Sequence, residues 1–256
     1  MDAASWISYY DYEGAQTLPM PLLLVDGGHD VWMGSNRGTK YSNINPNFPL
    51  ADDSTKGAEY LKQAKEKYAF SFDEMGNKDL PAMIDQILKV STQPKITYIG
   101  YSQGTTQMVA GLARQEESYF ASRVDKAILL APCLYPAQAA PVEFYNAVFP
   151  ELYRLGVYNA FDKDWATKVT RVCSNSNETA CSFVRDGLMV AEGTSIHALD
   201  HFYQIAVTDR FQGYIPDFGA ERVSREGALL PIGTIDKVPI QLVVFENDEV
   251  CPASFA

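Results

Sequence analysis

The sequence predicts an α/β protein with a mostly parallel sheet and a mainly helical insertion. Apolar, β-branched runs lie at 95–100, 125–132 and 238–249, and a segment with helical spacing of its apolar residues separates the first two. Such runs are typical of strands that are buried on both faces and pair in parallel. Between 133 and 237 this alternation gives way to many aromatic, proline and glycine residues, which favours an inserted helical region.

The elements are expected in a definite order along the chain. Residues 21–38 contain an apolar run, a Gly-Gly break, a short strand at 31–33 and a polar glycine loop. Residues 78–90 predict a helix, with Asp79 as its N-cap and Pro81 in its first turn. A strand at 95–100, a helix at 105–115 and a strand at 125–132 come next, and the strand at 238–249 follows the insertion.

The predicted organisation is a core, an insertion and a return to the core. Residues 1–132 form the first part of the core, residues 133–237 form the insertion, and residues 238–256 carry the returning strand. An insertion after a strand end lies over the carboxyl edge of the sheet, where α/β proteins form their sites. The insertion is therefore a candidate lid.

Composition narrows the classes of function. The chain has 256 residues, 46% of them hydrophobic, so it can bury the core of one large domain or of a domain with an insertion. Its formal net charge of −11 opposes binding to phosphate backbones, and we predict no nucleic-acid partner. No apolar run is long enough to cross a bilayer, and the first residues lack the basic and apolar regions of a signal peptide. The cysteine spacing lacks the Cys-x-x-Cys pairs of a zinc site, so we predict no metal.

A Gly-x-Ser-x-Gly motif, formed by Gly100, Ser102 and Gly104, joins the strand at 95–100 to the helix that follows it. A sharp strand-to-helix turn crowds the backbone, and glycines let the two elements approach. Such a turn points the Ser102 hydroxyl outward as a nucleophile. It also places the Gln103 N–H at a helix N-terminus, where it can donate to an oxyanion. The alternative is an ordinary glycine turn, which the strand before and the helix after disfavour.

An acidic partner is expected after a later strand, because enzymes with this turn order their triad as serine, acid and histidine. Glu246, Asp248 and Glu249 supply carboxylates at the end of the strand at 238–249. The separation between Ser102 and Asp248 leaves room for the helical insertion. A solvated acidic turn is the alternative interpretation of this segment.

A histidine base is not supplied in the expected place. None of the three histidines, His29, His197 and His201, follows Asp248. His29 precedes the predicted strand at 31–33, while His197 and His201 are spaced i, i+4 on a predicted helix of the insertion. That spacing can hold a metal, but no companion ligand set accompanies it, so we favour core or surface histidines.

Cysteines and a sequon point to the secretory route. Cys173 and Cys181 bracket a polar segment that contains a glycosylation sequon at Asn177. Cys133 and Cys251 each follow a predicted strand end near the site. The sequence gives no geometry that would pair them.

Six blocks of sequence occur in an order typical of one family. They are DVWMGSNRGTKYS, YAFSFDEMGNKDLPAMIDQIL, YIGYSQGTT, ILLAP, AEGTSIHALDHFYQ with FQGYIPDFG, and VPIQLVVFENDEV. In this order they resemble the acid lipases, the group that contains lysosomal acid lipase and gastric lipase. The match covers almost the whole chain, and the second and third blocks are too long for coincidence.

The resemblance implies an α/β-hydrolase fold with a lid over an apolar acyl pocket. It implies hydrolysis of triacylglycerols or steryl esters at a lipid-droplet or membrane interface, without a cofactor. Position by position, Ser102 resembles the family's nucleophile, Gln103 an oxyanion donor and Asp248 the triad acid.

The resemblance extends to the lid region. Cys173 and Cys181 resemble a cysteine pair of the family's lid, and His201 matches a lid histidine that is not the triad base. A secreted or lysosomal protein is implied as well.

Departures from the family limit what this chain is expected to do. Family members carry a His-Gly-Leu-like motif, with the second oxyanion donor, upstream of the part that begins at Met1, and a catalytic histidine beyond the part that ends at Ala256. GSNRG at 34–38 replaces Gly-Asn-Ser-Arg-Gly, and Tyr101 replaces a histidine. We therefore expect a piece of a serine lipase that alone hydrolyses esters at no useful rate.

Two other interpretations are compatible with parts of this sequence. A short, non-catalytic lipid-binding or interaction protein is the main alternative, although truncation at both ends would expose sheet edges. A thioesterase or peptidase would share the serine turn, but it would not explain the matches in the lid region.

Overall fold

The computed structural model describes residues 11–12, 15–16, 18–42, 57–114, 117–136, 142–160, 165, 169, 193–216 and 226–252. Within these residues the central sheet has three parallel strands in the order β3-β4-β7, formed by Ile96–Tyr101, Val124–Leu130 and Ile240–Val243. β4 lies in the middle and pairs with β3 on one side and β7 on the other. All three strands fall on predicted ones, so the α/β class and the parallel pairing are confirmed.

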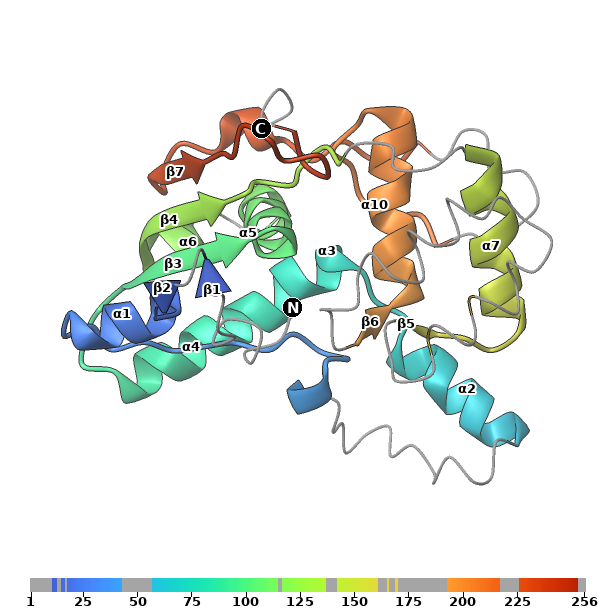
Figure 1. The fold of residues 1–256 in the computed structure, drawn as a ribbon, viewed down its shortest axis with the longest axis horizontal. Coiled ribbons are helices and arrows are strands. Elements are labelled where there is room, and N and C mark those ends of the chain that lie inside the picture. The colour runs from blue at the N-terminus through green and yellow to red at the C-terminus, as the bar shows by residue number, and fades with distance from the viewer. Residues whose placement is uncertain are drawn as a thin grey trace.

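Helices flank this sheet, and two of them, α7 and α10, lie together at the end of the molecule away from α1 (Figure 1). The helices are α1 (Met20–Asp26), α2 (Ala58–Lys67), α3 (Phe72–Glu74), α4 (Leu80–Val90), α5 (Gln103–Arg114), α6 (Glu117–Ala121), α7 (Val142–Arg154) and α10 (Ile196–Thr208). Shorter elements are the π-turn η4 (Met75–Asp79) and the 3₁₀ turns η2 (Lys40–Ser42) and η5 (Ile232–Thr234). Two antiparallel pairs join β1 (Asp11–Tyr12) to β2 (Ala15–Gln16), and β5 (Asn159–Ala160) to β6 (Thr194–Ser195). None of the helices described is long and apolar enough to cross a bilayer.

The helix predicted at 78–90 begins earlier than expected. Ser71 caps it, because its hydroxyl accepts from the Asp73 N–H (3.1 Å) while the Glu74 carboxylate accepts from the Ser71 N–H (2.9 Å). The chain then passes through α3 and η4 into α4, so Asp79 already has helical dihedrals. The prediction of Asp79 as the N-cap is wrong. Its carboxylate instead accepts hydrogen bonds from the backbone N–H of Arg37 (3.1 Å) and from its guanidinium (2.7 Å).

The strand predicted at 31–33 is not present. Val31, Trp32 and Met33 line a cavity of about 780 Å³ that is also lined by Ile96 and Tyr98 of β3. A strand exists only where a neighbour accepts its backbone hydrogen bonds. Across this cavity the segment at 31–33 faces β3 without pairing to it, which is why its β-branched and aromatic residues do not make a strand.

Two hydrophobic clusters meet at α10. The first packs α3, α4 and α5 against the sheet, with Phe72, Met108 and Leu129 fully buried in it. The second lies within the predicted insertion and contains Leu152 and Trp165. Ala198 and Ile205 of α10 belong to the first cluster, whereas Ile196 and Tyr203 belong to the second. The boundaries of the insertion, 133 and 237, remain a prediction.

An ion pair ties the segment after α10 to the core. The guanidinium of Arg114 on α5 donates twice to the Asp73 carboxylate, from Nε (3.0 Å) and from Nη2 (2.7 Å). Asp73 also accepts from the backbone N–H of Tyr214 (3.0 Å). Bidentate pairs of this kind are strong because charge and geometry act together. The block FSFDEMG thus anchors both the helix that carries the serine turn and the insertion.

Candidate active site

The turn between β3 and α5 holds the predicted nucleophile. β3 ends at Tyr101 and α5 begins at Gln103, so Ser102 alone makes the turn. Its φ of 50° lies in the left-handed region, which a residue with a side chain adopts only where its surroundings enforce it. The Ser102 N–H donates to the Leu130 carbonyl (3.0 Å). The Ser102 carbonyl accepts from the N–H (2.8 Å) and the hydroxyl (2.6 Å) of Thr105. These bonds fix the turn and leave the Ser102 side chain half-buried.

The two glycines of the motif differ in how tightly they are packed. A Cβ on Gly100 would lie 2.8 Å from the carbonyl carbon and oxygen of Gly104 and from the Tyr98 ring. No larger residue fits there unless the strand and the helix move apart. A Cβ on Gly104 would meet the Tyr98 hydroxyl at 3.5 Å, an ordinary contact. The crowding is therefore at Gly100, whose backbone packs closely against the backbone of Gly104.

A buried chain of hydrogen bonds supports the turn from the core. Asn36 donates from its amide to Gln107 (2.7 Å), Gln107 donates to the Tyr98 hydroxyl (3.1 Å), and that hydroxyl donates to the Gly104 carbonyl (2.8 Å). Burial raises the pKa of Tyr98 to about 12, although the hydrogen bond from Gln107 acts in the opposite direction. The Tyr98 hydroxyl therefore stays protonated, and it links the loop at 34–38 to the serine turn.

The predicted oxyanion donor opens α5. Gln103 is the first residue of that helix, so its backbone N–H is one of the terminal groups that no intrahelical carbonyl accepts. The side chain of Gln103 turns away toward η4, where its amide lies 2.8 Å from the Met75 sulfur. The backbone N–H and the Ser102 hydroxyl thus belong to adjacent residues at the same turn.

Asp248 differs from the other two candidate acids in its burial and its backbone contacts. It lies in the loop after β7, and its Oδ1 accepts from the N–H groups of Val250 (3.0 Å) and Cys251 (2.8 Å). These bonds fix the orientation of the carboxylate. Asp248 is half-buried, whereas Glu246 and Glu249 are exposed. The alternative of a freely solvated acidic turn fits those two glutamates and not Asp248.

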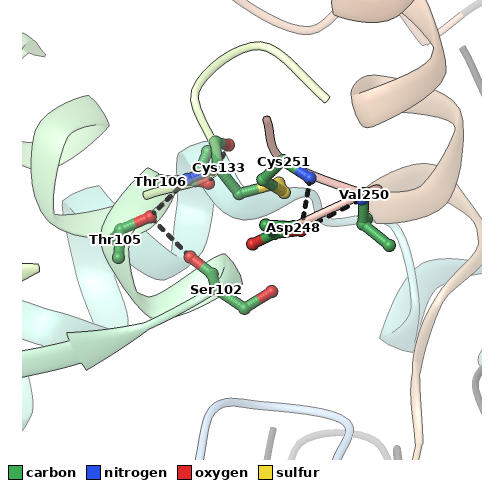
Figure 2. The surroundings of a disulfide bond; sticks show 7 residues. All are labelled: Ser102, Thr105, Thr106, Cys133, Asp248, Val250 and Cys251. Atoms are coloured by element: carbon green, nitrogen blue, oxygen red, sulfur yellow. Dashed lines mark hydrogen bonds between the residues drawn. A yellow bond between two sulfur atoms is a disulfide. The ribbon is translucent and has the colours of Figure 1, made fainter. Parts of the chain in front are cut away.

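The three strands bring the site residues to one edge of the sheet. Because β3, β4 and β7 run in parallel, the segments after them meet at their carboxyl ends. Ser102 follows β3, Cys133 follows β4 and Asp248 follows β7. In Figure 2 the Asp248 side chain lies between the Cys133–Cys251 bond and Ser102. The structure thus brings together the predicted serine and the predicted acid.

A disulfide joins Cys133 to Cys251, with a Cα–Cα distance of 5.0 Å. The backbone of Cys133 is held on both sides, because its N–H donates to the Thr105 hydroxyl (2.9 Å) and its carbonyl accepts from the Thr106 hydroxyl (2.6 Å). The sequence left this pairing open and gave no role to the two threonines. The available signal was the position of both cysteines directly after the ends of parallel strands.

The three histidines are positioned elsewhere. The imidazole of His201 is fully buried and stacks on Phe72 with ring centroids 3.7 Å apart. Its Nε2 lies 2.8 Å from the Gln212 carbonyl, which can only accept, so Nε2 carries the proton and Nδ1 accepts from the Ser71 hydroxyl (3.1 Å). Burial lowers the pKa of His201 to about 3. The hydrogen bond to the Gln212 carbonyl raises this pKa, and the nearby positive charge of Arg114 lowers it further. His201 is therefore a neutral, structural histidine.

The other two histidines lie in different surroundings. The His197 Nδ1 lies 2.9 Å from the Tyr214 hydroxyl, which itself donates to Asp200 (2.9 Å), so His197 donates to Tyr214. His29 lies exposed after α1. It lines the 780 Å³ cavity, whose lining includes neither Ser102 nor Asp248. No histidine of the chain is held at the serine turn by these contacts.

Some predicted features fall on other parts of the chain. Cys173, Cys181 and the sequon at Asn177 lie outside the described residues. Their pairing and modification remain predictions.

The arrangement supports one kind of chemistry. A serine hydroxyl becomes a nucleophile when a base takes its proton and fixed donors accept the resulting oxyanion. The turn supplies the hydroxyl of Ser102 and an N–H at a helix N-terminus, and the Asp248 carboxylate is held at the same edge of the sheet by two backbone N–H groups. Acyl transfer through a serine ester fits these groups.

Comparisons with known proteins agree with this geometry. Residues 8–214 match the family model described as the alpha/beta hydrolase fold. The chain is 30% identical over 225 residues to gastric triacylglycerol lipase of Mus musculus. The aligned region covers 76% of this chain and 52% of that protein. It is 28% identical over 243 residues to gastric triacylglycerol lipase of Homo sapiens, and this alignment covers 85% of this chain and 56% of that protein. It shares 29% identity over 240 residues with Lipase member N of Homo sapiens, and this alignment covers 83% of this chain and 55% of that protein. The chain thus spans about half the length of these relatives.

Proposed function

This chain belongs to the alpha/beta hydrolase fold family and is acid lipase-like, and on that premise we propose that it hydrolyses lipid esters through Ser102. One observation carries the proposal more than any other. Ser102 stands alone between β3 and α5 with a φ of 50°, a strained conformation that three hydrogen bonds maintain. Ala131 and Asp209 also have a positive φ, but only at Ser102 does this strain stand at a strand-to-helix turn of the Gly-x-Ser-x-Gly kind, where strained residues are typical of active sites.

The proposed reaction has two halves. The general base takes the Ser102 hydroxyl proton as the oxygen attacks the ester carbonyl, and the Gln103 N–H donates to the oxyanion that forms. The alcohol leaves with a proton from the general base, and the acyl group stays on Ser102. Water, activated by the same base, then releases the fatty acid and restores the serine. Asp248 acts by holding the base in the right tautomer and orientation.

The general base is the missing member of this triad. His197 and His201 are engaged with Tyr214, Ser71 and Gln212. His29 lines a cavity whose lining includes neither Ser102 nor Asp248. We propose that the base is a histidine outside these 256 residues, and that the chain alone hydrolyses esters at no useful rate. A serine without its base retains only the catalysis that oxyanion donors and binding provide.

The proposed substrates are triacylglycerols or steryl esters. Relatives named gastric triacylglycerol lipase suggest a neutral lipid, and the helices α7 and α10, with their own hydrophobic cluster, suit a lid over an acyl site. We propose that the protein works at a lipid–water interface, in a secreted or lysosomal setting. The Cys133–Cys251 disulfide favours such a compartment, because disulfides persist outside the reducing cytosol.

The first test is substitution of the nucleophile in the complete protein. Ser102→Ala should abolish release of nitrophenol from a short-chain nitrophenyl ester and of fatty acid from a triacylglycerol emulsion. Ser118→Ala, on the exposed face of α6, is the matched control and should keep full activity. A fluorescent alkyl phosphonate should label the protein at the peptide that contains Ser102. Unchanged hydrolysis in Ser102→Ala would end the proposal.

One alternative deserves the same experiment. The engagement of His197 and His201 in structural contacts favours a non-catalytic lipid-binding protein that keeps the fold. That alternative requires the complete protein to bind a triacylglycerol emulsion with no turnover and no phosphonate labelling. Ser102-dependent turnover would exclude it.

A further inference from the structure

We propose that the Cys133–Cys251 disulfide and Thr105 form a positioning device that holds the Asp248 carboxylate in register with Ser102. The effect of this device on catalysis rests on the proposed function, because the device positions Asp248, the proposed acid of that site. The device runs from the serine turn to the acid through one hydroxyl, one covalent bond and one backbone N–H.

The first link joins the serine turn to the chain after β4. The Thr105 hydroxyl donates to the Ser102 carbonyl (2.6 Å) and accepts from the Cys133 N–H (2.9 Å). Thr105 is completely buried, so water does not compete for these bonds. A movement of Cys133 would therefore shift Thr105 and, through it, the backbone of Ser102.

The second link is the disulfide itself. Cys133 follows β4 and Cys251 lies in the loop after β7, and the two half-cystines are separated by 118 residues. Both are nearly fully buried. The bond clamps the ends of two neighbouring strands together just beyond the point where their hydrogen-bonded ladder stops.

The third link connects the disulfide to the acid. The N–H of Cys251 donates to Asp248 Oδ1 (2.8 Å), and Val250 adds a second donor at 3.0 Å. The residue that is covalently anchored is thus the residue that orients the carboxylate. Figure 2 shows all three links around the bond.

The loop that carries Asp248 needs such an anchor. Within the part of the chain that the structure describes, β7 is an outer strand of four residues that pairs with β4 alone. Leu242, Val244 and Phe245 are about half exposed, at 48%, 46% and 51%, so within the described residues few apolar contacts hold the chain before the loop. A catalytic acid misplaced by about 1 Å can cost on the order of a hundredfold in rate. The disulfide gives this loop a covalent fixed point next to Asp248.

The central experiment is a double-mutant cycle on the complete protein. Cys133→Ser and Cys251→Ser should each lower kcat about tenfold to a hundredfold and leave KM nearly unchanged. In an Asp248→Asn background the same substitutions should cost almost nothing more, because the disulfide acts through that carboxylate. Independent, multiplicative losses would overturn the proposal, since they would mean that the disulfide acts on stability alone.

Thr105 offers a matched pair of variants. Thr105→Val removes the hydroxyl and keeps the shape, and it should lower kcat in the same direction as loss of the disulfide. Thr105→Ser restores the hydroxyl and should rescue most of the loss. Equal activity of the valine and serine variants would contradict the first link.

Reduction of the folded protein covers the case in which the cysteine variants do not fold. A dithiol gives the bond two electrons and two protons, so that Cys133 and Cys251 become thiols and the reductant closes into its own disulfide. Reduced protein should show the same loss of kcat as the variants. Reductant added to the Cys133→Ser/Cys251→Ser protein is the control, and it should change nothing if Cys173 and Cys181 are not involved. Full kcat in the reduced protein, with the bond shown to be open, would overturn the proposal.

Hydrogen exchange separates this proposal from the proposed function. When the bond is opened, the amides of Val250 and Cys251 should exchange faster while those of β3 and β4 keep their protection. Unchanged protection at Val250 and Cys251 would refute the positioning device whatever the activity. Loss of protection there, with no Ser102-dependent turnover in any form, would refute the proposed function and leave the structural device standing.

Discussion

Acid should destabilise this protein through one buried imidazole, that of His201. The folded protein keeps His201 neutral down to a pKa of about 3, whereas the unfolded chain takes up a proton near the ordinary value of 6.5. Below pH 6.5 the unfolded state therefore binds more protons than the folded state, so stability is present above that pH and is lost as the pH falls toward 3. Each pH unit in this window costs about 1.4 kcal/mol, which gives about 2 kcal/mol between pH 7 and pH 5.

The variant that isolates this effect is His201→Gln. Glutamine cannot ionise in this range, and its amide can still donate to the Gln212 carbonyl. It loses the stacking on Phe72, so at pH 7 it should be less stable than the natural protein by about 1–3 kcal/mol. At pH 5 the gap should shrink by about 2 kcal/mol, because only the natural protein pays the cost of keeping an imidazole uncharged.

The assay is urea unfolding followed by tryptophan fluorescence at pH 7 and pH 5. The carboxylates that make up the net charge of −11 titrate in both proteins, so their contribution cancels in the difference. A gap that stays constant across this range would show that His201 titrates alike in the folded and unfolded states. The assignment of His201 as a neutral core histidine would then be wrong.

Three further predictions follow from the packing around the serine turn. Gly100→Ala should destabilise the protein by about 1–3 kcal/mol, because its Cβ would meet Gly104 and Tyr98 at 2.8 Å, whereas Gly104→Ala should be neutral; thermal melts of the two variants give the comparison. Tyr98→Phe removes the donor to the Gly104 carbonyl and should cost about 1 kcal/mol in urea unfolding. Asp73→Asn breaks the bidentate pair with Arg114 and should cost about 2–3 kcal/mol at low salt, discounted because the guanidinium is one-third exposed; a loss below 0.5 kcal/mol would contradict this anchor role.

The strands were predictable because their signal is local. The runs at 95–100, 125–132 and 238–249 are apolar and β-branched, and each contains a strand of the parallel sheet. Burial on both faces was wrong for the last of them, because β7 covers only Ile240–Val243 and its Ile240 and Leu242 side chains are exposed. The segment at 31–33 is also apolar, but among the described residues no strand pairs with it. Strand formation depends on a neighbour, and the sequence of one segment does not contain that neighbour.

The helix start was missed for a related reason. Asp79 is a good capping residue by type, but the capping box at Ser71 and Glu74 begins the helix earlier, and a π-turn carries it through. Once inside a helix, Asp79 is free to pair with Arg37, a residue far away in sequence. Ser71 and Asp79 are both acceptable N-caps by residue type, and contacts with residues distant in sequence, such as Arg37, decide which of them caps the helix.

The site was predictable in its chemistry and not in its scaffolding. The glycines around Ser102 and the acid after a strand carry a recognisable order, whereas the hydroxyl of Thr105 and the pairing of Cys133 with Cys251 depend on which loops meet in space. Parallel strands bring their carboxyl ends together, and that rule was enough to place both cysteines near the site. It was not enough to pair them.

The Cys133–Cys251 bond also makes a covalent ring of everything between its two half-cystines, the predicted lid included. Closing a ring of this length removes chain entropy from the unfolded protein, about 5 kcal/mol in the loop-closure estimate. A protease that cuts the backbone once anywhere inside the ring leaves two pieces that stay joined. Such nicked protein would migrate as one chain without reductant and as two with it, and the severed lid would remain tethered to the core at both ends.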